Sequence, residues 1–64
     1  MTRTIIETER GFVRAEFVPG RRYPETFWFD ETMAQPFAPT HASMLFRLLE
    51  NNDVEVKRAF EIIS

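Results

Sequence analysis

The sequence predicts a small α+β domain, with a three-stranded antiparallel sheet followed by one or two C-terminal helices packed on one face of the sheet. Apolar and polar side chains alternate in the first half of the chain, which indicates strands. From residue 40 the apolar side chains recur at helical spacing instead. The 64 residues leave room for a single domain, and we expect it to span residues 1–64.

A β-hairpin is expected at the start of the chain. Residues 3–9 mix Thr and Ile and favour a first strand, and residues 12–18 alternate and favour a second. We expect a three-residue connection between them, which ends at Gly11, a residue that tolerates positive φ. The second strand places Val13, Ala15 and Phe17 on one face and Arg14 and Glu16 on the other.

A third strand is expected over residues 26–31, after a Pro-Gly pair at residues 19–20 that favours a type II turn. Phe27 and Phe29 share one face of this strand, and Trp28 lies on the other. If the phenylalanines pack against the helices, the indole of Trp28 points to solvent on the far face of the sheet. A phase shift of one residue would instead bury Trp28 and expose the phenylalanines.

An ordered loop over residues 32–40 should lead from the sheet to the helices. Met33 and Phe37 are its large apolar residues, and we expect both to pack against the core. Thr40 is expected to cap the helix that follows, through its hydroxyl. The Asn-Asn pair at residues 51–52 is expected to end that helix.

The last segment, residues 53–64, fits two structures. As a helix it has an apolar face that includes Ala59, Phe60 and Ile63. As a strand it alternates apolar and charged residues, except that Arg58 interrupts the apolar face. We favour the helix for that reason, and the strand alternative gives the order β-β-β-α-β.

Residues that could carry catalysis or bind a metal are scarce. The chain has no cysteine and one histidine, so we expect no metal site and no cofactor. That histidine, His41, lies two residues from Ser43, and on a helix the two side chains would point in different directions. Carboxylate pairs such as Glu7 and Glu9 fit a solvated strand face. We therefore expect a protein that is not an enzyme.

The sequence shows no segment for a membrane or for export. No stretch approaches the ~20 apolar residues of a membrane span, and the N-terminal residues lack the apolar run of a signal peptide. Together with the absence of cysteine, this favours a cytoplasmic protein without a membrane partner.

The candidate partner-binding surface is the sheet face that we expect to be free of helices. Its expected residues are Trp28, Phe12, Arg14, Glu16 and Tyr23. An exposed aromatic side chain with charged neighbours is typical of protein-binding surfaces. We expect a module that occupies the surface of another protein, or that forms a homodimer. In size and lack of sites the chain is similar to small accessory proteins of phages and mobile elements, such as anti-restriction and anti-CRISPR inhibitors.

A second hypothesis is binding of nucleic acid, DNA in particular, by the N-terminal strands. Arginines of residues 1–22 could contact phosphates, with Trp28 or Tyr23 stacking on a base. These arginines are Arg3, Arg10, Arg14, Arg21 and Arg22. The net charge of −2 and the glutamates on the same strands make nucleic acid the less favoured partner.

Overall fold

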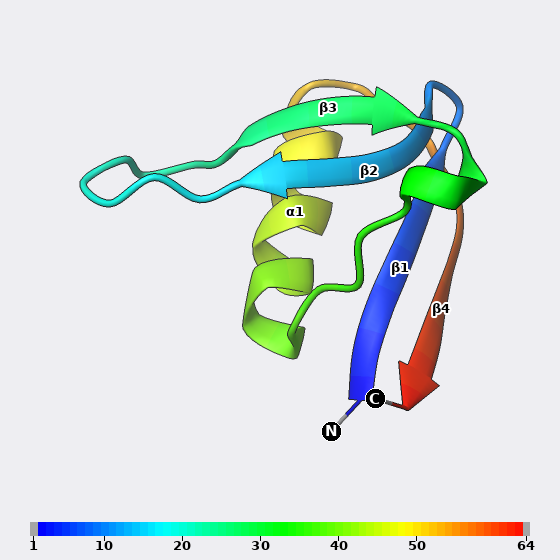
Figure 1. Ribbon diagram of the computed structural model, residues 1–64. Helices are drawn as coiled ribbons and strands as arrows, with labels where there is room; N and C mark the ends of the chain where they lie inside the picture. Colours follow the sequence, from blue (N-terminus) through cyan, green and yellow to red (C-terminus); the bar gives the residue numbers. More distant parts are fainter. Residues whose placement is uncertain (1, 64) are drawn as a thin grey trace.

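Four strands and one α-helix are present in residues 2–63, the part of the chain that this computed structural model describes (Figure 1). In chain order the elements are β1 (Thr2–Thr8), β2 (Gly11–Glu16), β3 (Glu25–Phe29), the short 3-10 helix η1 (Glu31–Met33), α1 (Pro39–Asn51) and β4 (Val56–Ile63). The α+β class and the antiparallel sheet are confirmed. The order is the β-β-β-α-β alternative, and the second helix that we favoured was wrong.

The sheet has the strand order β3-β2-β1-β4, and each neighbouring pair is antiparallel. The central strands β1 and β2 pair only beside their turn, where Glu7 lies opposite Phe12 and Thr8 opposite Gly11. Beyond this point they diverge, so that β2 and β3 lie across the top of Figure 1 while β1 and β4 stand nearly upright below them. The sheet is therefore bent into two halves, β2–β3 and β1–β4.

The segment between β3 and α1 closes the gap between these two halves. The N–H of Ala15 on β2 donates to Oε1 of Gln35 at 3.0 Å. On β1, Thr4 exchanges two backbone hydrogen bonds of 2.8 Å with Phe37. These bonds satisfy strand groups that lose their ladder partner where β1 and β2 separate. The expected loop is confirmed over residues 34–38, between η1 and α1, and Phe37 is buried as expected, with 1% of its surface exposed.

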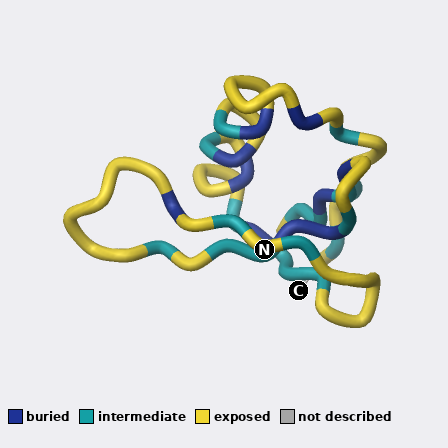
Figure 2. The backbone as a smooth tube through the Cα atoms, turned by 90° about the horizontal axis from the view of Figure 1, so that it is seen from above, coloured by how far each residue is buried: buried dark blue, intermediate teal, exposed yellow. Residues whose placement is uncertain are grey.

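The core lies between α1 and one face of the bent sheet. It joins both halves of the sheet, the loop and the helix, through Ile6, Val13, Phe37, Ala42, Leu45, Leu49 and Val54. Figure 2 shows the buried positions of α1 on the side of the helix that faces the strands. Burying one Val, Leu, Ile or Phe side chain contributes roughly 1.5–3 kcal/mol. Large side chains thus stabilise a domain that has no cysteine for a disulfide.

Residues 56–63 form a strand because the helix stops before them. Asp53 has a left-handed φ of 56°, and this conformation turns the chain from α1 back toward the sheet. The following residues pair with β1 as β4, where Arg58 lies opposite Glu7. The arginine that interrupts the apolar alternation therefore has an acidic partner on the same face. Ser64, the last residue of the expected helix, lies outside the described residues.

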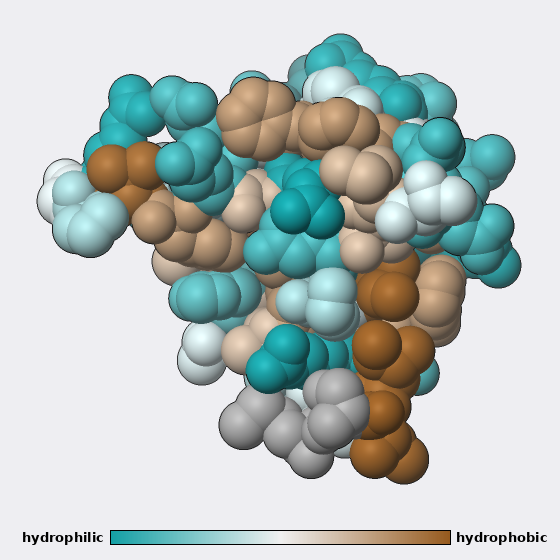
Figure 3. All heavy atoms as spheres, viewed as in Figure 1, coloured by the Kyte–Doolittle hydropathy of each residue, from teal (hydrophilic) through white to brown (hydrophobic). Residues whose placement is uncertain are grey.

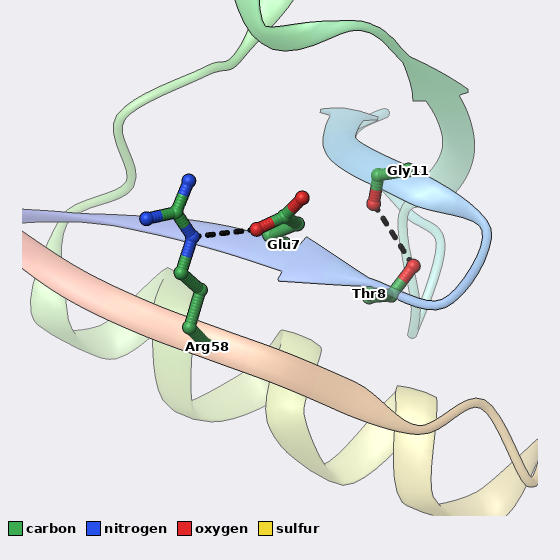
Figure 4. A network of polar contacts seen from close by, with 4 residues as sticks. All are labelled: Glu7, Thr8, Gly11 and Arg58. Atoms are coloured by element: carbon green, nitrogen blue, oxygen red, sulfur yellow. Dashed lines mark hydrogen bonds and ion pairs between the residues drawn. The ribbon is translucent and has the colours of Figure 1, made fainter.

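The turn between β1 and β2 differs from expectation by one residue. Two residues, Glu9 and Arg10, connect the strands rather than three, and Gly11 already belongs to β2. Gly11 has a φ of 127°, and a Cβ atom here would lie 2.9 Å from the carbonyl oxygen of Phe29. Both the conformation and the space therefore require glycine. Thr8 supports the turn, because its hydroxyl donates to the Gly11 carbonyl oxygen at 2.9 Å (Figure 4).

The other expected turn and the helix ends are largely confirmed. The Pro-Gly turn has its hydrogen bond of 3.2 Å from the Arg21 N–H to the Val18 carbonyl, with a φ of 87° at the glycine. Asn52 is the C-cap of α1, as expected. The expected cap at the other end was wrong, because Thr40 lies inside a helix whose N-cap is Ala38. Pro39 fixes that start, since the first helical position needs no N–H donor.

Candidate functional site

The face of the sheet turned away from α1 carries the candidate site, and we call it the outer face. Residues that lie opposite each other in antiparallel strands point to the same face, so the pairing defines its members. One row across all four strands consists of Phe29, Phe12, Glu7 and Arg58. The other outer-face residues are Arg3, Ile5, Arg14, Glu16, Glu25, Phe27, Phe60 and Ile62.

Trp28 does not belong to the outer face, so the expected phase of the third strand was wrong. It lies opposite Val13, which is fully buried, and its side chain packs against the core while remaining partly exposed. The guanidinium of Arg10 lies 5.8 Å from the centre of the indole ring. The exposed aromatics of this strand are instead Phe27 and Phe29, with 41% and 40% of their surface accessible. The alternative with a phase shift of one residue is therefore the one that the structure has.

A hollow of about 400 Å³ lies beside the two phenylalanines. Its lining consists of Arg14, Ala15, Glu16, Phe27, Phe29 and Gln35. Arg14 is held in place because its Nη1 donates to the carbonyl oxygen of Met33 at 3.0 Å. Met33 itself is 43% exposed, so its expected packing against the core was wrong. The hollow thus combines aromatic edges, an oriented guanidinium and a carboxylate.

An ion pair between β1 and β4 lies at the centre of the outer face. Arg58 Nε lies 2.5 Å from Glu7 Oε1 (Figure 4). The guanidinium of Arg58 also lies 5.2 Å from the ring centre of Phe60 and 6.0 Å from that of Phe12. Phe12 is only 6% exposed. Phe12 therefore packs beneath the neighbouring side chains of the outer face and presents little area to a partner.

Apolar side chains form a large part of the surface in Figure 3, both over β2 and β3 and along β4. Charged side chains lie between these apolar areas. Outer-face residues with opposite charges also alternate on β2, with Arg14 and Glu16. Aromatic groups and charges of both signs are therefore interspersed on the outer face.

The structure brings together three of the five expected partner-binding residues, namely Phe12, Arg14 and Glu16. Trp28 lies on the opposite face, and Tyr23 lies in the β2–β3 loop against α1. The structure adds Phe27 and Phe29, which the phase of the third strand had assigned to the core. No signal in the sequence distinguishes the two phases, because both faces of this strand carry aromatic residues.

A second hollow, of about 540 Å³, lies between the β2–β3 loop and α1. It is lined by Arg22, Tyr23, Thr40, Ser43, Met44 and Arg47. Within residues 2–63, neither Arg22 nor Arg47 takes part in an ion pair. By contrast, Arg21 is paired with Glu25 at 2.7 Å. The N-terminal arginines are therefore distributed over the outer face, the hairpin turn and the β2–β3 loop, and they form no continuous surface.

The structure places the ring of His41 on Phe17, with ring centres 4.0 Å apart and planes inclined by 18°. The contact ties the start of α1 to the end of β2, and Ser43 instead lines the second hollow. Among the described residues, no group of three His, Cys, Asp or Glu side chains is placed to hold a metal ion. Within the same residues, no helix has the length and apolar character to cross a membrane.

A comparison of the chain with protein-family models, with curated proteins and with solved structures finds no match.

Proposed function

We propose that this protein is a binding module that occupies the surface of a partner protein with the β2–β3 half of its outer face. The observation that carries this proposal is the pair of exposed phenylalanines, Phe27 and Phe29, beside the hollow that contains Arg14. Exposed aromatic rings are costly in water, and desolvating them is the main source of binding energy at such surfaces.

The kind of partner follows from the lining of the hollow. Its volume of about 400 Å³ accommodates one or two apolar side chains between the phenylalanines and Gln35. The Arg14 guanidinium uses one N–H for Met33, and its remaining donors suit a carboxylate or a carbonyl of the partner. We therefore expect a partner segment with an apolar side chain next to an acidic one.

The size of the domain sets the scale of the interface. Its accessible surface is 4584 Å², and a standard interface takes about 800 Å² from each partner. One partner would therefore cover about a sixth of the accessible surface. This area is larger than the hollow and would include the outer face around it. Inhibition by covering a partner's surface, in the manner of small phage-encoded inhibitors, needs no chemistry from this chain.

The test compares two phenylalanines on opposite sides of the molecule. Phe27→Ala removes an exposed ring from the outer face, and Phe46→Ala removes a ring of similar exposure, 36%, from α1. Proteins captured by the immobilised chain are identified by mass spectrometry, and their affinity for each variant is measured by calorimetry. We expect Phe27→Ala to weaken binding by more than about 2 kcal/mol and Phe46→Ala to have little effect. Equal affinities of the two variants would refute the outer face as the binding surface.

Nucleic-acid binding is the second candidate, and the second hollow is the observation in its favour. Arg22 and Arg47 there could contact phosphates while Tyr23 stacks on a base. Replacing both arginines with glutamine would then abolish binding of single-stranded or duplex DNA at low salt, where such binding is strongest. Absence of any mobility shift of DNA by the unmodified protein at low salt would exclude this candidate.

A further inference from the structure

β4 is an edge strand, and its outer edge is well suited to pairing with another strand. It is the last strand in the order β3-β2-β1-β4, so in the described part of the chain it pairs on one side only. It is long for an edge strand of so small a sheet, and it ends in Ile63, which is 90% exposed. Natural edge strands are usually short or otherwise protected against pairing with a second chain.

The hydrogen bonds of β1 show which backbone groups of β4 point outward. Thr4 uses its N–H and its C=O for Phe37, on the side of β1 away from β4. Because these groups alternate along a strand, Ile5 turns its own pair toward β4, where Phe60 lies opposite. Phe60 therefore points its N–H and C=O at β1, and its neighbours Ala59 and Glu61 point theirs to the outer edge.

We propose that two copies of this chain associate by antiparallel pairing of their β4 strands, related by a two-fold axis at Phe60. Four backbone hydrogen bonds then link Ala59 of each copy to Glu61 of the other. The two four-stranded sheets become one continuous sheet, and the interface is isologous, as in most homodimers. The inference is independent of the partner that binds the β2–β3 half of the outer face.

Charge and strand regularity select this register from those with the axis at Arg58, Ala59, Phe60 or Glu61. Self-pairing requires that opposed residues share a face, so the axis must pass through a residue rather than between two. An axis at Arg58 opposes two guanidinium groups, and an axis at Glu61 opposes two carboxylates. An axis at Ala59 brings the β-bulge at Lys57 into the ladder, because Thr8 pairs with Val56 while Glu7 pairs with Arg58.

An axis at Phe60 avoids these conflicts. Its ladder runs from Arg58 to Ile62, which is the regular part of the strand. Phe60 lies on the outer face, so the rings of the two copies meet there as a cross-strand aromatic pair. Arg58 of each copy lies opposite Ile62 of the other, and Glu61 lies opposite Ala59. No two like charges therefore lie directly opposite each other in this ladder.

The first test uses proline at matched positions of the two edge strands. Ala59→Pro removes an N–H that points to the outer edge of β4, so it leaves the β1–β4 ladder intact. Thr26→Pro makes the same change on β3. Ala15 of β2 lies opposite Thr26, and its N–H points away from β3 because it donates to Gln35. The backbone groups of Arg14 and Phe27 therefore pair β2 with β3, and those of Thr26 point to the outer edge of β3. Sedimentation velocity over a dilution series measures the dimer, and circular dichroism checks the fold of each variant.

We expect a concentration-dependent dimer for the unmodified chain and for Thr26→Pro, and at least about a hundredfold weaker association for Ala59→Pro, since two of the four hydrogen bonds are lost. A monomer at every concentration, or dissociation by Thr26→Pro instead, would overturn the proposal.

Disulfide trapping provides a second test that does not require proline. Phe60→Cys should cross-link spontaneously in air, whereas Glu61→Cys should stay largely reduced, and the reverse result would overturn the register.

Discussion

The stability of two single variants, Trp28→Ala and Phe27→Ala, tests the assignment of the two sheet faces. Trp28 packs against the core opposite Val13, whereas Phe27 is 41% exposed on the outer face. Truncating a packed aromatic residue to alanine costs about 3–5 kcal/mol, and we expect about 3 kcal/mol for Trp28 because its ring is only partly buried. For Phe27, which keeps nearly half of its surface in water, we expect about 1 kcal/mol.

These magnitudes are large compared with the stability of so small a domain. A core of this size rarely supplies more than about 3–5 kcal/mol, so Trp28→Ala should leave the chain at the edge of unfolding. With a slope of about 1 kcal/mol per molar urea, the unfolding midpoint should fall by about 3 M for Trp28→Ala and by about 1 M for Phe27→Ala. Because Trp28 is the only tryptophan, unfolding is followed by circular dichroism rather than by fluorescence. Equal midpoints, or a lower one for Phe27→Ala, would refute the assignment of the faces.

Two further predictions concern backbone positions. Gly11→Ala should destabilise the domain by more than about 2 kcal/mol, because its φ of 127° and the nearby Phe29 carbonyl both oppose a Cβ atom. At Gly20 a Cβ atom would meet open space, so Gly20→Ala should cost about 1 kcal/mol. Thermal denaturation measures the stability of both variants. Gln35→Ala should leave the Ala15 N–H without its acceptor, at a cost of about 1 kcal/mol, and hydrogen exchange at that amide should accelerate. An unchanged exchange rate of the Ala15 amide would contradict the role of Gln35 as its hydrogen-bond acceptor between β1 and β2.

The sequence was sufficient for most of the elements but not for the faces of the third strand. Alternation, the Pro-Gly turn and the helical spacing after residue 40 each depend on local sequence, and each predicted an element correctly. The phase of β3 depends on which aromatic side chains meet the helix. Because Phe27, Trp28 and Phe29 are consecutive, each face of the strand carries an aromatic side chain in either phase, and local sequence does not select the phase.

The last segment shows the same limit in another form. Its pattern fits a helix and a strand, and local sequence favoured the helix. The strand forms because β1, some fifty residues earlier in the chain, pairs with it along its edge. Arg58 interrupts the apolar alternation of the strand, but its ion pair with Glu7 of β1 makes a charged residue favourable at this position. Tyr23 was expected on the outer face, but the β2–β3 loop places it beside α1.

The pairing of β1 with β4 also determines how the molecule would respond to mechanical force. Thr2 and Ile63 lie opposite each other at the same end of the two strands. Pulling on these two residues would load the hydrogen bonds of the ladder one after another, as in opening a zipper, rather than all together in shear. A tether attached at these points would therefore release β4 at low force, while the β2–β3 half, which bears no load until then, would still be folded.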